Sequence, residues 1–182
     1  MTKNVGVLYR ASKNLNFHCL KQLYFSLIHS HINYGNIVWA SCYKTKTNKI
    51  FIKQKQAIRI VFRKDRYSSA GPLMLDLNAL NVYQLNIFHI LQFMHKVKYN
   101  LVPEVFRDQF SFIHHNYPTR FSKFNNRTPK PSTTPKFSIL SRGPKLFNCI
   151  LNDTEKCINN VKVFKKQIKS KVISITSVNR FF

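Results

Sequence analysis

Acidic side chains are scarce in this sequence. Its 182 residues include 30 Lys and Arg but only 6 Asp and Glu, which gives a formal net charge of +24. Residues 1–64 contain no acid, and none lies between Asp108 and Asp153. Such an imbalance would repel itself in an isolated domain and therefore indicates a polyanionic partner. It also leaves no paired carboxylates for two-metal chemistry, so we expect no catalysis by this chain and no catalytic residue.

Glycine and cysteine are scarce as well. The 4 Gly form no phosphate-binding loop and no nucleophile elbow, and the sequence contains no H-E-x-x-H motif. The 4 Cys form no C-x-x-C pair and have no histidines at zinc-finger spacing. We therefore expect reduced thiols, no metal site and no cofactor.

Two long stretches lack charge altogether, residues 22–43 and 77–95. Both contain Asn, Gln and His, which a spanning helix tolerates poorly, so we expect buried helices and no membrane partner. The first twenty residues are basic and acid-free, as a mitochondrial presequence can be, but so are the next forty. Localisation stays open on this basis, with the nucleus or cytoplasm expected if the chain is expressed.

Hydrophobic periodicity predicts a mainly α-helical chain. We expect helices from about residue 17 to 32, capped by Asn14 or Asn16, and over 47–63, 72–77, 83–98, 103–110 and 160–175. Trp39 is predicted to be in the core, and His89 and His95 at the edge of the surface. Residues 114–137 are rich in Pro, Asn, Ser, Thr and base, which predicts a loop or short strands. Residues 137–151 predict one strand and then a turn at Gly143-Pro144.

The helix over residues 47–63 separates into two faces. At about 100° per residue its apolar arc holds Ile50, Phe51, Gln54, Ala57, Ile58, Val61 and Phe62. Outside that arc, Lys55, Arg59 and Arg63 stand one turn apart with no acid nearby, and like charges at this spacing repel. The row indicates an external anion, with a merely solvated face as the alternative. The last predicted helix, over residues 160–175, also separates an apolar face from a basic one.

Several motifs in order resemble one known family. Residues 20–41, "LKQLYFSLIHSHINYGNIVWAS", precede residues 44–61, "KTKTNKIFIKQKQAIRIV". Further on come "YPTR" and "GPKLFN", the latter with Phe147 where the family has tryptophan. Together they resemble the region downstream of the palm in reverse transcriptases of non-LTR retrotransposons, jockey/CR1-like. The similarity covers roughly residues 4–173. It implies a thumb-like helical region and an extension that grip a primer–template.

The resemblance implies three segments. They are a thumb-like basic helical hairpin over 1–64, a helical region over 65–110, and a basic loop, short strand and C-terminal helix over 111–182. The palm with its paired aspartates, the fingers and the endonuclease are missing from the sequence. We therefore expect a truncated fragment or decayed copy without polymerase activity, which binds RNA or DNA non-specifically and for which the missing palm is a further partner.

Twelve cations are candidate nucleic-acid contacts: Lys46, Lys49, Lys53, Lys55, Arg59, Arg63, Arg120, Arg142, Lys145, Lys165, Lys166 and Lys169. Basic faces interleaved with aromatic residues are typical of nucleic-acid binding. Two alternatives stay open. One is an independent basic RNA-binding protein, and the other is a membrane-surface or protein-interaction module that uses its basic amphipathic helices.

Overall fold

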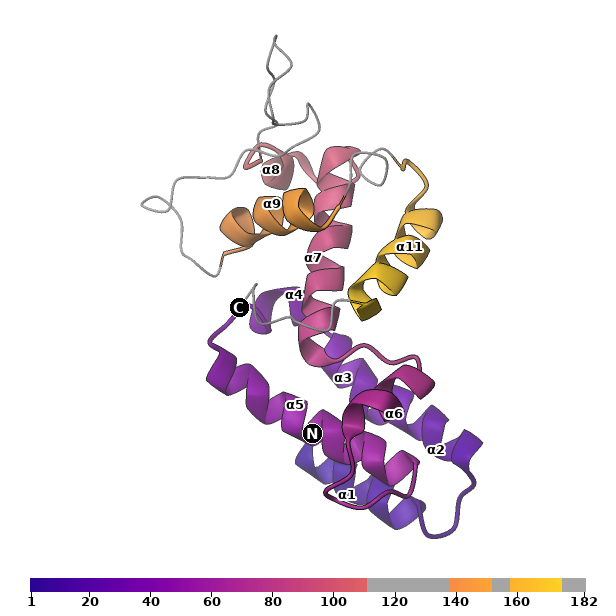
Figure 1. Cartoon of the computed structure of the whole chain (residues 1–182). Helices are drawn as coiled ribbons and strands as arrows, with labels where there is room; N and C mark the ends of the chain where they lie inside the picture. Colours follow the sequence, from indigo (N-terminus) through magenta and orange to yellow (C-terminus); the bar gives the residue numbers. More distant parts are fainter. Residues whose placement is uncertain (111–137, 152–157, 175–182) are drawn as a thin grey trace. The chain divides into compact units, whose positions relative to one another are not determined.

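The computed structural model describes residues 1–110, 138–151 and 158–174 (Figure 1). The chain forms two compact units, Met1–Asn86 and Ile87–Phe182. The described residues are helical and contain no strand, which confirms the mainly α class. The division into three segments at residues 64 and 110 stays a prediction. The basic loop over 111–137 lies outside the described residues.

The first unit is organised around one long helix, α5. That helix spans Lys44–Val61 and packs against α1, α2 and α6. The other elements of the unit are α1 (Thr2–Ala11), α2 (Phe17–Tyr24), the π-helical turn η1 (Phe25–His29), α3 (Ser30–Asn33), α4 (Asn36–Trp39), α6 (Ala70–Asp76) and the start of α7 (Val82–Lys98).

Helices α2, η1 and α3 form one continuous helical run that begins at the predicted cap. The side chain of Asn16 accepts a hydrogen bond from the Cys19 amide at 2.9 Å. Residues spaced four apart drift by about 40° per step around a straight α-helix. The wider π turn offsets that drift. The buried side chains therefore stay on one face: Leu20, Tyr24, Ile28 and Ile32.

A single buried amide joins α5 to α2, to the segment before α7 and to the first turn of α7. Gln54, which is 0% exposed, donates through Nε2 to the Tyr24 hydroxyl at 3.1 Å and to the Leu80 carbonyl at 2.9 Å. Its Oε1 accepts from the Val82 amide at 3.0 Å. Burial raises the pKa of Tyr24 to about 12, and the hydrogen bond from Gln54 opposes that rise. Tyr24 therefore stays a neutral hydroxyl at physiological pH.

The amide of Gln54 also completes the start of α7. The first amides of a helix have no partner within it, and Val82 provides the first of them. The third, on Gln84, donates to the Asn81 side chain at 2.8 Å, and the Gln84 side chain accepts from the Asn81 amide at 3.1 Å. This reciprocal pair is a capping box. Helix α7 is thus fixed at its first turn by side chains from its own sequence and from α5.

Tryptophan 39 differs from its prediction. Trp39 is half-buried and not in the core, and its indole nitrogen donates to the Tyr34 carbonyl at 2.8 Å. The chain turns between those residues at Gly35, whose φ of 57° is left-handed. The bend brings α4 close enough for Asn86 to donate to the Asn36 carbonyl at 3.1 Å.

The second unit contains the rest of α7 with α8 (Glu104–Arg107), α9 (Ile139–Ile150) and α11 (Val161–Ser174). The strand and turn predicted for residues 137–151 are wrong, because Gly143 and Pro144 lie inside α9. The Ser138 hydroxyl caps this helix by accepting from the Leu140 amide at 3.2 Å. A Cβ on Gly143 would lie 2.7 Å from Met94 Sδ, so glycine permits the close approach of α9 to α7. Tertiary packing outweighs the local turn signal.

His95 is a buried polar residue of this unit that contacts α11 and the segment before it. The prediction of a surface-edge position is wrong, because His95 is 0% exposed. Its Nε2 donates to the Ile158 carbonyl at 2.7 Å, and its ring stacks on Phe164 of α11 with centroids 3.8 Å apart. Burial lowers the pKa of His95, the bond to Ile158 opposes this change, and Lys98 adds to it. The imidazole is therefore held neutral between α7 and α11.

We predict that Gln54→Leu destabilises the first unit. Leucine keeps the approximate size but leaves the Tyr24 hydroxyl, the Leu80 carbonyl and the Val82 amide without this partner. Each buried group left unpaired costs about 1–3 kcal/mol, so we expect a loss of at least about 3 kcal/mol in urea unfolding. Gln56→Leu, at a half-buried position of the same helix, is the control and should change little. Equal effects of the two changes would contradict the network.

We predict that His95 makes stability depend on pH. Because folding lowers the pKa of His95, the unfolded chain takes up the proton more readily. The contribution of the neutral imidazole to the free energy of unfolding should be fully present above about pH 6.5 and should fall as the pH drops below that value. Denaturant titrations between pH 7 and pH 5 should show a smaller fall in His95→Gln than in the wild type. The exposed His31→Gln control should follow the wild type.

Candidate nucleic-acid interface

Helix α5 buries one narrow stripe and exposes basic flanks on both sides of it. Its buried residues are Thr47, Gln54, Ala57, Ile58 and Val61. At 100° per residue they occupy an arc of about 100°. The predicted apolar face is confirmed for Gln54, Ala57, Ile58 and Val61, while Ile50 and Phe51 are half-buried.

One flank consists of Lys46, Lys49 and Lys53, which we call the α5 lysine face. On the helical wheel the three lie within about 60° of one another. Lys46 and Lys49 are exposed and Lys53 is half-buried. The sequence places no acidic residue before Asp65, so neither α5 nor the helices before it contain a carboxylate to neutralise this face. The predicted cations are therefore brought together here without an acidic partner in the same helix.

The opposite flank differs from its prediction. The row of Lys55, Arg59 and Arg63 was expected to project to solvent with no acid nearby, and the structure shows non-acidic partners for all three. Lys55 Nζ lies 4.6 Å from the centroid of the Phe51 ring, a cation–π contact. Arg59 Nε donates to the Ser68 carbonyl at 2.8 Å. An Arg63 terminal nitrogen donates to the Leu15 carbonyl at 2.7 Å. The two arginines thus hold connecting segments in place, and their removal would disturb the fold.

Arg63 also lies beyond the end of the helix. Helix α5 ends at Val61, and Arg63 has a left-handed φ of 52°. The Lys64 amide donates to the Arg59 carbonyl at 2.9 Å and the Arg63 amide to the Ile60 carbonyl at 3.1 Å. These two bonds define a Schellman motif. Its left-handed position usually carries Gly or Asn, so no sequence pattern predicts an arginine at this helix end.

The second unit separates its predicted cations into buried and exposed groups. Arg142 is only 8% exposed, and burial lowers the pKa of its guanidinium. Helix α9 turns this residue inward, and its role as a nucleic-acid contact stays a prediction. Lys145 of the same helix is exposed.

The last predicted helix is α11, and it packs through an apolar face as predicted. It buries Phe164, Ile168 and Val172. Of its predicted cations, Lys165 and Lys166 are exposed and Lys169 is half-buried. We call Lys165, Lys166 and Lys169 the α11 lysine face. Arg120 lies outside the described residues.

One cation was missing from the predicted set. Arg66 is exposed and follows α5 in a segment without helical periodicity, so no sequence pattern singled it out. It lines a cavity together with Arg59 and Lys64. The fold of the segment between α5 and α6 brings Arg66 beside α5.

The described residues also bear on membrane-spanning helices, metal sites and thiols. Over 1–110, 138–151 and 158–174, no helix is both long and apolar enough to cross a bilayer. In that part of the chain no three His, Cys, Asp or Glu side chains lie close enough to share a metal ion. The thiols of Cys19 and Cys42 are half-buried and that of Cys149 is exposed, and all three are free.

We predict that Arg63→Gly is more stable than Arg63→Ala by about 1 kcal/mol. Both changes remove the bond to Leu15, but only glycine adopts the left-handed conformation without strain. The measurement is urea unfolding of the two variants. At the neighbouring Lys64, whose φ is not positive, the order should reverse, with alanine the more stable. The same order at both positions would argue against the helix end described above.

Comparison with known proteins adds no information on this surface. No protein-family model matches the chain, and neither does any curated protein or any solved structure.

Proposed function

We propose that this chain binds nucleic acid non-specifically through the α5 and α11 lysine faces, as a thumb-like region of a non-LTR reverse transcriptase grips a primer–template. The observation that carries the proposal is the α5 lysine face. Lys46, Lys49 and Lys53 project from one flank of a helix whose adjacent stripe is fixed in the core, and residues 1–64 contain no acid. Repulsion among like charges is relieved when a polyanion supplies the missing negative charge.

The spacing of this face suits a phosphate backbone. Lys46 and Lys53 are separated by about 10 Å along the helix axis. Duplex DNA presents about six negative charges over that length, which is enough to meet all three ammonium groups. Lysine side chains are flexible, so they follow phosphates and not base edges. Contacts of this kind give affinity without sequence preference.

In the segment that carries the resemblance, some residues stabilise the helix and others remain at the surface. Residues 54–59, "QKQAIR", belong to the segment that carries the resemblance, and of these Gln54, Ala57 and Ile58 are buried. Arg59 holds a connecting segment. The motif therefore builds and stabilises the helix, and the lysines that precede it are left for the ligand. This is the arrangement expected for a gripping element that performs no chemistry.

The second unit has a surface of the same kind. The α11 lysine face lies on a helix that is fixed in place by Phe164, Ile168 and Val172. Exposed Lys145 of α9 is a further candidate contact in this unit. We assign no catalytic residue and no cofactor to the chain. A polymerase palm is the proposed partner that would supply catalysis.

The test is a Lys46→Gln, Lys49→Gln, Lys53→Gln variant. We expect weaker binding to duplexes of any sequence and a log–log salt slope smaller in magnitude by about 2.7, which is 0.9 for each phosphate that the variant no longer neutralises. Stability should change little, because surface charges contribute weakly and three repelling cations are removed. Fluorescence anisotropy at several salt concentrations and circular dichroism measure the two effects.

Two controls separate this face from net charge alone. Exchange of the same three lysines for arginine keeps the charge and should keep the affinity and slope. Removal of three other exposed cations, Lys3, Arg10 and Lys13 of the first helix and its end, should reduce the slope less. If both removals have equal effects, binding is diffuse attraction and the assigned face is wrong. Tighter binding to anionic vesicles than to duplex would favour the membrane-surface alternative.

A further inference from the structure

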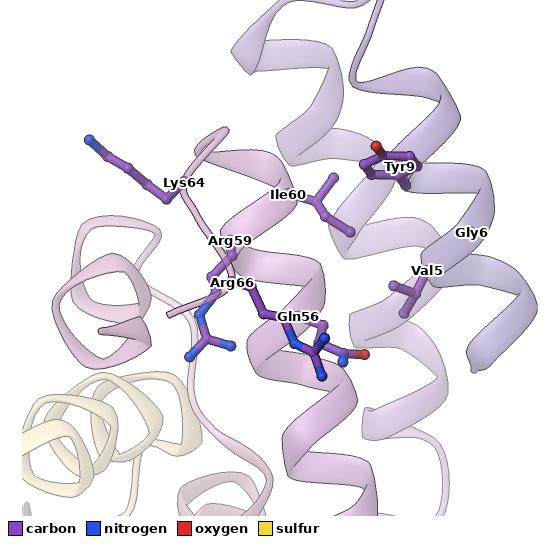
Figure 2. Close-up of a pocket in the computed structure, with 8 residues that line it drawn as sticks. All are labelled: Val5, Gly6, Tyr9, Gln56, Arg59, Ile60, Lys64 and Arg66. Carbon is purple, nitrogen blue, oxygen red and sulfur yellow. The ribbon is translucent and has the colours of Figure 1, made fainter. Parts of the chain in front are cut away.

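A cavity of about 370 Å³ opens between α1 and α5 (Figure 2). Its volume lies near the lower end of the range for sites of small ligands, about 300–1,000 Å³. All of its walls belong to the first unit. The lining residues are Val5, Gly6, Tyr9, Gln56, Arg59, Ile60, Lys64 and Arg66. None of them is acidic.

The two sides of the cavity differ in chemistry. Tyr9 and Val5 project from α1 toward Ile60 of α5 and form an aromatic and aliphatic wall (Figure 2). Arg59 and Arg66 lie on the other side with Gln56, while Lys64 extends away from the other labelled side chains. The cavity therefore presents an apolar wall that faces a cationic one.

One of the cations is held in a fixed position. Arg59 is half-buried, and its Nε donates to the Ser68 carbonyl at 2.8 Å. That bond orients the planar guanidinium and leaves its terminal N–H groups to a ligand. A guanidinium binds phosphate through two parallel hydrogen bonds, which gives geometry as well as charge. Arg66 is exposed and lines the same cavity, so a second guanidinium is available to the same anion.

Gly6 keeps the cavity open. It lies inside α1, where glycine costs about 1 kcal/mol relative to alanine. A Cβ built on it would meet no heavy atom of the described chain within 4 Å, so packing does not require glycine at this position. The Cβ of an alanine would therefore lie in open space at the cavity wall. The absence of a side chain here preserves volume for a ligand.

We propose that this cavity binds one unpaired nucleotide of a single strand. The base rests on Tyr9, Val5 and Ile60, Gln56 offers hydrogen bonds to its edge, and Arg59 and Arg66 hold its phosphate. Single-strand binding commonly combines aromatic stacking with a basic groove, and every base has a face that can stack. The inference rests on the proposed function, and it adds a base-dependent site to binding that otherwise reads phosphates alone.

The test compares two strands that differ only in their bases. The wild-type chain is titrated with an oligothymidylate and with an abasic strand of the same length. We expect the base-containing strand to bind about 5- to 150-fold more tightly, the range for stacking one base on an aromatic side chain. In Gly6→Leu, which adds a large side chain to the cavity lining, the two strands should bind equally. Gly6→Ala adds one methyl group and should keep most of the preference while stabilising α1.

A second variant keeps the test independent of folding. Tyr9 is 58% exposed, so Tyr9→Ala removes the stacking surface at little structural cost. It should also lose the preference, with its circular dichroism unchanged. If Gly6→Leu and Tyr9→Ala both keep the wild-type preference, the cavity does not bind the base and the inference is overturned. Tighter binding of dodecanoate than of thymidine monophosphate would overturn it as well.

The two proposals fail in different ways. Equal binding of both strands by the wild type, with a steep salt dependence, would overturn the nucleotide site and leave the lysine faces in place. Absence of binding to either strand would overturn both proposals.

Discussion

The first unit depends on the amide of Gln54. An amide buried in an apolar core is destabilising unless its donors and acceptor are met, and here both kinds of atom have partners. Because the partners come from α2, from the segment before α7 and from the first turn of α7, one side chain fixes the register of three elements on α5. Apolar packing alone tolerates sliding, whereas hydrogen bonds at 2.9–3.1 Å permit one arrangement. The lysine face is oriented by the same restraint.

Arginine and lysine have different roles in this chain. Arg59 and Arg63 donate to backbone carbonyls, and Arg142 is buried. Most of the lysines in the predicted set remain at the surface. The guanidinium is weakly hydrated and has five donors in a rigid fork, so it satisfies carbonyls inside a fold, while the ammonium is strongly hydrated and stays in water. The formal charge of +24 therefore overstates the charge that the surface presents, since Arg142 is buried.

Periodic helices with clear caps could be predicted from the sequence, and contacts between distant segments could not. The helices around Leu20, Ile58, Ile87 and Phe164 follow from apolar spacing, and even the inward position of Gln54 was expected from its arc. Helix α9 was not, because Gly143-Pro144 is locally a turn signal, and the close approach of Gly143 to Met94 depends on the tertiary fold. The partners of Arg59 and Arg63 are carbonyls, which every residue has and no sequence pattern identifies. Lys46, Lys49 and Lys53 were each among the predicted contacts, but the row that the sequence singled out on this helix was Lys55, Arg59 and Arg63.

The π-helical turn at Phe25–His29 has a consequence for how the chain can vary in length. A π turn holds one more residue than an α turn, so it marks a position where a single-residue insertion is absorbed inside a helix. Loss of one residue there would restore an α turn and bring Tyr24 and Ile28 to a spacing of three, which also keeps one face. The core contacts of Leu20 and Ile32 would survive. Variation in length should therefore be tolerated at this turn and excluded from α5, where a shift of one residue would move Gln54 away from its partners.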